Sequence, residues 1–400
     1  MIRNRFPATL VLAPCLLLLG AAGAPAGAQE QPVTFELPDP WGPFHPGVRT
    51  LLVTDSTRED LVSEAEGDFR PLLVRVWYPS DATAGDSRPY MDARTADAWR
   101  GTLPAPDGFE EYVVTHAIPD IPLSGARDRW PVLLFSPGRS FPVENYQSTL
   151  EYLASQGWVV AAISPPYEEA LTVLPDGRAL PFSGPGWESE EERGDVLMGV
   201  VDEMVRDASV VLDRLEALDR DTDDGFSGRL DLAGGVGYLG HSLGGAAAAW
   251  TLQREPRVTA AASWEGQVYR DSDRPLSLTG GDLMYIIGGA NRAEFVGTQF
   301  RPGKEGVTVH ELVIRGAWHA SFGDLLDIYR RYAGRDWLER HRREVFADRV
   351  NQITNDYVHE FFAHALLGDP LDLLWPDSLE DEGSPVRWDY PEVELRTYAR

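Results

Sequence analysis

One short segment has the residue types and spacing of a serine nucleophile. Residues 240–244 read Gly-His-Ser-Leu-Gly, so a glycine stands two positions before and two positions after Ser242. At a sharp turn between a strand and a helix, this pattern holds the serine in a strained backbone and exposes its hydroxyl above a sheet. An apolar run precedes the turn and an alanine-rich run follows it. Ser242 is therefore the candidate nucleophile, and an ordinary glycine-rich turn is the alternative.

The same stretch also spells a dinucleotide-binding pattern, with Gly235, Gly237 and Gly240 at the spacing G-x-G-x-x-G. In a true fingerprint these glycines follow the strand and open the helix. Here the residues between them are apolar and form the expected strand itself. We therefore expect no NAD binding and no other cofactor.

A serine nucleophile needs a base, and His319 fits this role best among the eight histidines. It ends the turn 315–319 directly after an expected strand, and it follows the serine in the chain, as this type of site requires. A structural loop histidine is the alternative. The other seven precede the nucleophile, adjoin it, or fall in expected strands and helices: His45, His116, His241, His310, His341, His359 and His364.

The orienting acid should follow a strand between the serine and the base. Glu265 does so, directly after the apolar run 260–264, and it is the favoured acid. Asp271 and Asp273 lie farther along a polar segment, where we expect solvated side chains.

An acyl-transfer site also needs N–H donors for the developing oxyanion. The backbone N–H of Leu243 adjoins the nucleophile, and that of Arg139 lies in the turn after the first strong strand. These two are the candidate donors. For the Arg139 side chain we expect exposure at the surface, with contact to an anionic head group as the alternative.

The scaffold that must position these residues is predicted from Trp130 onward, where apolar strands alternate with helices. Buried strands that do not alternate in polarity, separated by helices, indicate a mostly parallel sheet covered on both faces. The fold class is therefore α/β, with ligand residues beyond the carboxyl ends of the strands. The expected strands cover 131–135, 158–163, 235–239, 258–264, 284–287 and 307–314, and the expected helices 144–156, 195–218 and 345–367.

Four segments are expected along the chain. Residues 1–28 have the layout of a secretory signal peptide, with Arg3 and Arg5 before an apolar run and small residues at 26–28. A retained anchor is the alternative. The signal implies a secreted or periplasmic protein. The other segments are an N-terminal extension with the first strands near 48–53 and 72–78 (29–128), the catalytic core (129–370) and a C-terminal tail (371–400).

Composition excludes several classes of function. The chain of 400 residues is 43% hydrophobic, and its net charge of −27 disfavours binding to nucleic acid. Its single cysteine, Cys15, lies in the expected signal peptide, so the mature chain would have no thiol nucleophile and no disulfide. Ala363 stands where a zinc helix starting at His359 would need its second histidine, so no metal site is expected.

These motifs in combination resemble the plasma-type platelet-activating factor acetylhydrolase family of the α/β-hydrolase superfamily. The likeness extends from about residue 45 to 325. It is carried by 47–49, 74–79, the run Pro-Val-Leu-Leu-Phe-Ser-Pro-Gly at 131–138, 155–160, the serine turn and 315–319. The resemblance implies a secreted α/β-hydrolase that cleaves short or oxidised sn-2 acyl chains from phospholipids without a metal. It assigns Ser242 as nucleophile, His319 as base, and Leu243 and Arg139 as oxyanion donors.

Two positions depart from the family pattern. Pro137 stands where a histidine is common, and Glu265 stands where the family has aspartate. The departure at Glu265 weakens both the acid and the substrate assignment. The expected function is therefore a serine esterase acting on a small-molecule or lipid ester, with weak contact to lipid surfaces. The alternatives are a general carboxylesterase or dienelactone-hydrolase-like enzyme, and a non-catalytic hydrolase-fold binding protein.

The expected loop 165–193 bears on the substrate. Its apolar residues are positioned to rim a pocket for an apolar chain, and plain packing over the sheet edge is the alternative. These residues are Leu174, Leu180, Pro181, Phe182 and Trp187.

Overall fold

The computed structural model describes residues 33–60, 62–63, 67–100, 105–269, 276–289, 299–332, 347–374 and 390–399. The expected signal peptide (1–28) lies outside the described residues, and so do Asp271, Asp273 and His341.

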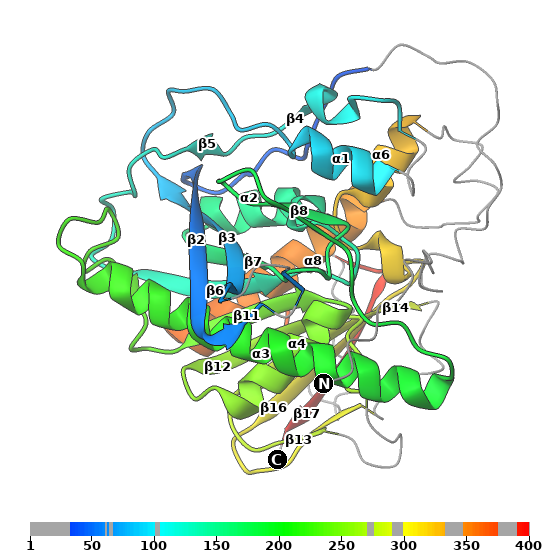
Figure 1. Cartoon of the computed structure of the whole chain (residues 1–400). Coiled ribbons are helices and arrows are strands. Elements are labelled where there is room, and N and C mark those ends of the chain that lie inside the picture. Colours follow the sequence, from blue (N-terminus) through cyan, green and yellow to red (C-terminus); the bar gives the residue numbers. More distant parts are fainter. Residues whose placement is uncertain are drawn as a thin grey trace.

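A mixed sheet of 11 strands forms the centre of the fold (Figure 1). Its middle strands are parallel, as the sequence predicts, whereas the edge strand Val393–Ala399 pairs antiparallel with Thr308–Ile314, and Phe69–Ser80 pairs antiparallel with both of its neighbours. The short β10 (Leu230–Asp231) pairs with Trp130–Ser136. In spatial order the others are β17 (Val393–Ala399), β16 (Thr308–Ile314), β14 (Asp282–Gly288), β12 (Val258–Trp264), β11 (Val236–His241), β6 (Trp130–Ser136), β7 (Val159–Ser164), β3 (Phe69–Ser80), β2 (His45–Glu59) and β5 (Ile118–Pro119).

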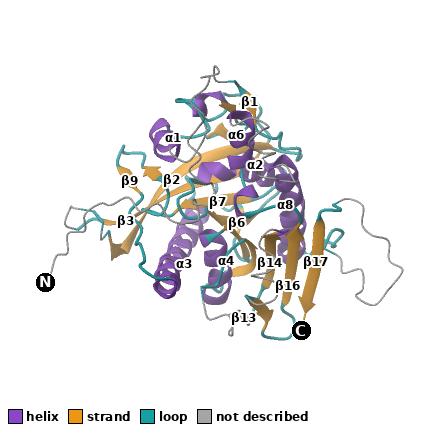
Figure 2. Cartoon of the chain, turned by 90° about the vertical axis from the view of Figure 1, so that its right-hand side faces the viewer, coloured by secondary structure: helices purple, strands orange, loops and turns teal. Residues whose placement is uncertain are grey.

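Helices cover both faces of the sheet (Figure 2). On β6, Val132 and Leu134 face the core under α3 (Glu190–Arg220) and α4 (Leu243–Arg254). Leu133 and its alternate neighbours face the core under α2 (Gln147–Ser155) and α8 (Ala347–Phe362), which continues as a π-helix to Leu367. Because both faces are buried, the strands carry no polar side, which explains their continuous apolar runs.

Segments that the sequence analysis treats as irregular contain ordered elements. Residues 80–128 include α1 (Ala93–Arg100) and the short helix Phe109–Tyr112, which share an apolar cluster with α6 (Leu325–Tyr332). Residues 165–193 include a hairpin of β8 (Leu171–Val173) and β9 (Ala179–Pro181). The predicted tail 371–400 includes β17, which completes one edge of the main sheet. Two further small pairs are β1 (Phe35–Glu36) with β4 (Val113–Val114) and β13 (Leu276–Leu278) with β15 (Phe300–Pro302).

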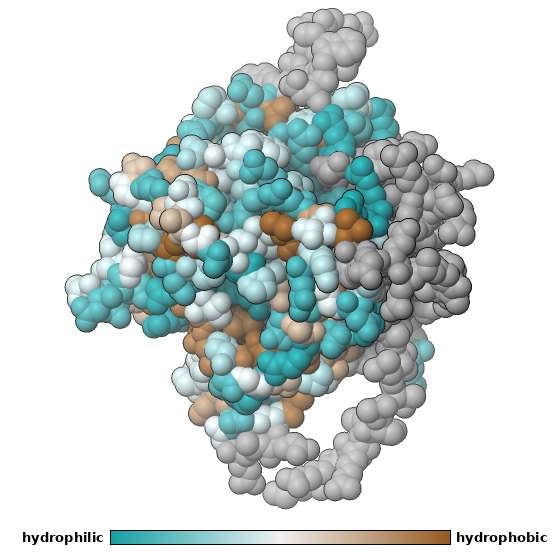
Figure 3. All heavy atoms as spheres, turned by 90° about the horizontal axis from the view of Figure 1, so that it is seen from above, coloured by the Kyte–Doolittle hydropathy of each residue, from teal (hydrophilic) through white to brown (hydrophobic). Residues whose placement is uncertain are grey.

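The surface carries its apolar side chains in separate places. The face shown in Figure 3 is mostly hydrophilic, with hydrophobic side chains in separated patches. Within the described part of the chain, no helix is both long and apolar enough to cross a membrane.

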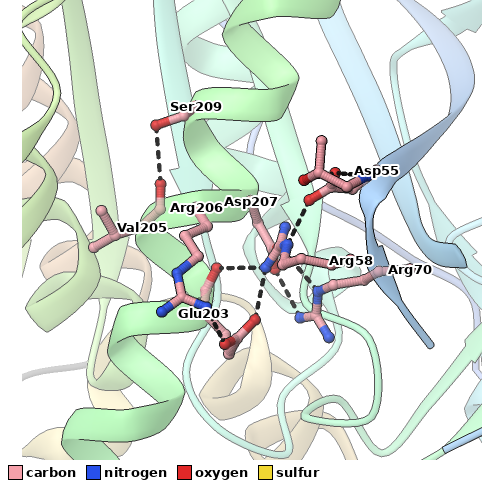
Figure 4. Close-up of polar contacts among 9 residues, drawn as sticks. Asp55, Arg58, Arg70, Glu203, Val205, Arg206, Asp207 and Ser209 are labelled. Carbon is pink, nitrogen blue, oxygen red and sulfur yellow. Dashed lines mark hydrogen bonds and ion pairs between the residues drawn. The ribbon is translucent and has the colours of Figure 1, made fainter. Parts of the chain in front are cut away.

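An ionic cluster around the buried Asp207 joins the hairpin of β2 and β3 to α3 (Figure 4). Asp207 on α3 has a side chain that is only 1% exposed, and it accepts hydrogen bonds from Arg58 at 2.6 Å and from Arg70 at 2.8 Å. Arg58 also reaches Asp55 and, at 2.7 Å, Glu203. One carboxylate thus holds two arginines of the hairpin against the helix.

Candidate active site

Ser242 occupies the turn between β11 and α4, as the sequence predicts. Its φ of 53° lies in the left-handed region, and its N–H donates to the carbonyl of Trp264 at 2.7 Å. The flanking glycines are required by close packing. A Cβ at Gly240 would lie 2.3 Å from backbone atoms of Gly244, and a Cβ at Gly244 would lie 2.1 Å from the carbonyl oxygen of Ser136. The tight turn is a strained backbone that only small neighbours allow.

His319 lies directly opposite the serine. It opens the short helix His319–Ser321 after β16, and its Nε2 lies 2.9 Å from Ser242 Oγ. For Nε2 to accept the serine proton, the imidazole hydrogen must be on Nδ1.

Glu265 lies next to that nitrogen. Its side chain is 2% exposed, and its Oε2 lies 3.3 Å from His319 Nδ1. The other carboxylate oxygen accepts a hydrogen bond from the Gly288 N–H. Glu265 follows β12 and has a φ of 55°, which turns its side chain from the strand end toward the base. The structure therefore brings the three predicted residues into one hydrogen-bonded series.

The two expected oxyanion donors flank the nucleophile. Leu243 is the first residue of α4, where backbone N–H groups have no partner within the helix. Arg139 follows Gly138, where a Cβ would lie 3.2 Å from Ser242 Cβ, so the loop is packed against the nucleophile turn. Among the residues that the structure describes, the Arg139 N–H has no hydrogen-bond acceptor. Both N–H groups therefore remain the candidate donors for an oxyanion at Ser242.

The side chain of Arg139 is not at the surface, contrary to our expectation. It is 11% exposed, and its Nε donates to Glu168 at 2.7 Å. Its guanidinium carbon lies 5.0 Å from the ring centre of Phe182 and 5.2 Å from that of Trp187. The reason is that loop 165–193 folds back over the turn, and it also supplies the carbonyl of Pro185 as an acceptor at 2.7 Å.

Two other residues of this loop do not rim a pocket. Leu174 and Leu180 are 2% and 6% exposed and pack with Leu73 and Tyr167. For these two residues, packing over the sheet is the correct interpretation.

Sequence reasoning missed the contacts beneath the site. His241 is fully buried, and its ring lies 4.8 Å from that of His319 between centroids. Its Nδ1 lies 2.7 Å from the hydroxyl of Tyr146, a residue that no motif indicates. Nothing in the spacing of the sequence relates Tyr146 to the nucleophile.

No cluster of three or more His, Cys, Asp or Glu side chains that could hold a metal ion occurs within the described ranges. Gly237 and Gly240 lie inside β11 rather than at the start of α4, so the glycine pattern does not have the arrangement of a dinucleotide site.

Comparisons with known proteins agree with this architecture. No family model matches the chain. A protein of Arthroderma benhamiae, described as a probable 1-alkyl-2-acetylglycerophosphocholine esterase, is 24% identical over 404 residues, which cover 94% of this chain and 97% of that protein. The solved structure of a ferulic acid esterase from Streptomyces cinnamoneus has a TM-score of 0.70 at 24% identity, covering 90% of this chain and 98% of that one. The structural similarity shows that the chain has the α/β-hydrolase type of fold, and the sequence similarity to the Arthroderma protein supports an esterase.

Proposed function

We propose that this chain is a serine esterase that forms an acyl-enzyme on Ser242. The observation that carries the proposal is the continuous series in which Ser242 Oγ lies 2.9 Å from His319 and His319 lies 3.3 Å from Glu265. A serine with an oriented base and an acid behind it is the arrangement of an activated nucleophile.

In the first half of the reaction, His319 Nε2 takes the proton as Ser242 Oγ attacks the ester carbonyl carbon. The carbonyl oxygen becomes an oxyanion, which accepts hydrogen bonds from the N–H groups of Leu243 and Arg139. Collapse of this intermediate breaks the bond to the alcohol oxygen, which leaves with the proton from His319.

In the second half, His319 takes a proton from water, whose oxygen attacks the acyl carbon on Ser242. The acid is released, and the proton returns to Ser242 Oγ. Throughout, Glu265 holds the hydrogen of His319 on Nδ1 and stabilises the imidazolium.

For the substrate, we favour a short or oxidised acyl ester, with the sn-2 acyl group of a phospholipid first. This choice is supported by the sequence resemblance and by the relative described as a probable 1-alkyl-2-acetylglycerophosphocholine esterase. A net charge of −27 disfavours docking on anionic bilayers, so we expect dispersed or zwitterionic lipids, met outside the cytoplasm after secretion.

A second candidate is a carboxylesterase acting on non-lipid esters, including aromatic ones. Two observations favour it: the structural similarity to a ferulic acid esterase, and the rings of Phe182 and Trp187 beside the Arg139 guanidinium. A hydrolase fold used only for binding would have no need for the close contact between Ser242 and His319.

One experiment tests both levels of the proposal. The protein is incubated with a fluorophosphonate probe, and hydrolysis is measured on 2-acetyl and 2-palmitoyl phosphatidylcholines, methyl ferulate and nitrophenyl acetate. We expect labelling and faster cleavage of acetyl than of palmitoyl esters, both unchanged by EDTA. Activity on ferulate or nitrophenyl esters with none on any phospholipid would favour the second candidate, and no labelling would refute the esterase.

A further inference from the structure

A buried chain of hydrogen bonds lies directly below the candidate site. The carbonyl oxygen of His319 lies 2.9 Å from His241 Nε2, and His241 Nδ1 lies 2.7 Å from the hydroxyl of Tyr146. The Tyr146 oxygen in turn accepts a hydrogen bond from the Gly138 N–H at 3.2 Å. His241 and Tyr146 are both fully buried.

The direction of each hydrogen bond follows from the chemistry of its partners. A carbonyl oxygen only accepts, so the hydrogen of His241 must be on Nε2. Burial and the neighbouring His319 hold the pKa of His241 well below its usual range, so the ring is neutral and Nδ1 carries a lone pair. The Tyr146 hydroxyl therefore donates to Nδ1, while the Gly138 N–H occupies the tyrosine oxygen from the other side.

This chain connects three parts of the site that come from separate strand ends. Gly138 precedes the oxyanion donor Arg139 after β6, His241 precedes Ser242 at the end of β11, and His319 follows β16. No other tautomer of His241 satisfies all its partners, because with its hydrogen on Nδ1 the Nε2 lone pair would face the lone pairs of the His319 carbonyl. The His319 carbonyl thus requires the tautomer with hydrogen on Nε2, and the Tyr146 hydroxyl stabilises this tautomer by donating to the Nδ1 lone pair.

We propose that Tyr146 and His241 are positioning residues, in which the tyrosine hydroxyl donates to Nδ1 and stabilises the histidine tautomer whose Nε2–H anchors the backbone of His319 beside Ser242. Neither residue touches the reacting atoms. This inference rests on the esterase function proposed above.

The first test is Tyr146→Phe, which keeps the ring and removes the hydroxyl. We expect kcat to fall about tenfold, the effect of one hydrogen bond on positioning, with KM changed by less than about twofold. Tyr152→Phe is the matched control, because Tyr152, on α2, is also a buried tyrosine, and its hydroxyl donates instead to Asp356 at 3.1 Å. The control should keep its kcat.

A second variant shows whether the Tyr146 hydroxyl acts by stabilising the His241 tautomer or has a purely structural role. The side-chain amide of His241→Gln has no tautomers. We therefore expect its N–H to donate to the His319 carbonyl whether or not the Tyr146 hydroxyl is present. In this background, Tyr146→Phe should cost less than about threefold in kcat, so the two substitutions are strongly non-additive. Equal effects of Tyr146→Phe in both backgrounds would overturn the proposal, even if Tyr146→Phe alone is poorly stable.

A spectroscopic measurement tests the geometry without catalysis. Selective ¹⁵N labelling of histidine should show His241 with a protonated Nε2 and an unprotonated Nδ1, a pattern that Tyr146→Phe disturbs. A fluorophosphonate-reactive wild type with unchanged kcat in Tyr146→Phe would overturn this inference alone. A wild type that neither reacts nor hydrolyses any ester would overturn the proposed function together with it.

Discussion

The carboxylate of Glu265 lies 3.3 Å from Nδ1 of His319, although 54 positions separate these residues in the chain. They follow β12 and β16, which are not neighbours, since β14 lies between them. The positive φ of Glu265 turns its side chain along the strand ends, and the Gly288 N–H at the end of β14 binds the other carboxylate oxygen. The middle strand thus supports the contact between the outer two.

The nucleophile is tested by Ser242→Ala. We expect kcat to fall roughly 10³-fold or more, because the base then has no hydroxyl to activate, while the fold stays intact. Initial rates on nitrophenyl acetate and a thermal unfolding curve measure the two properties. Esterase activity close to that of the wild type would exclude the mechanism.

The acid is tested by Glu265→Gln. The amide can no longer hold the hydrogen of His319 on Nδ1 or stabilise the imidazolium, so we expect kcat to fall by up to roughly 10⁴-fold. Asp271→Asn and Asp273→Asn are the controls and should keep most of their activity. If Asp271→Asn proved the more damaging change, the acid would be misassigned.

The ionic cluster on α3 is tested by Asp207→Ala. The substitution leaves the partly buried guanidinium groups of Arg58 and Arg70 without their shared carboxylate, so we expect a loss of up to about 3–5 kcal/mol in the free energy of unfolding. Arg206→Gln is the control, because its ion pair with Glu203 is exposed and should contribute less than about 1 kcal/mol. Urea denaturation measures both variants. If Asp207→Ala and Arg206→Gln lost similar free energies of unfolding, the cluster around Asp207 would have no special role.

We expect Glu169 to make the stability of the fold depend on pH. Burial, with Glu144 nearby, raises the pKa of Glu169 from 4.5 to about 8, although Val143 N–H and the Thr172 hydroxyl donate to its carboxylate. Between pH 4.5 and about pH 8 the unfolded chain binds fewer protons than the folded one, so the free energy of unfolding falls as the pH rises.

Glu169→Gln stays neutral and should lose this dependence. We expect the Tm of the variant, relative to that of the wild type, to increase from pH 5.5 to pH 8.5. A difference in Tm that stays constant over this interval would show that Glu169 does not titrate as inferred.

The sequence predicts the parallel strands well because each is buried on both faces and has a continuous apolar run. The residues of the site follow from their places after these strands, so Ser242, His319 and Glu265 could be placed together from order and spacing alone. Strand β17 was missed, although Val393, Leu395 and Thr397 alternate with charged residues. It is isolated in the sequence, and the residues of β16 with which it pairs lie about 80 to 90 positions earlier in the chain.

The contacts of individual side chains could not be predicted in the same way. Arg139 is held by Glu168, Phe182 and Trp187, all from a loop whose path depends on tertiary packing. Tyr146 meets His241 only because the short helix Val143–Tyr146, which precedes α2, and β11 are brought together in the fold. Periodicity describes which face a residue takes, but not which polar atom it meets there.

The sheet order implies that the strands before Ser242 and before His319 differ in how often they open locally. Ser242 follows β11, which lies in the interior between β6 and β12, whereas His319 follows β16, whose outer neighbour β17 is the edge strand of the sheet in the part of the chain that the structure describes. Strands near an edge exchange their amide hydrogens through smaller openings than central strands do. Amides of β16 should therefore exchange before those of β11, and heating should release the base from the serine while the rest of the sheet is still folded.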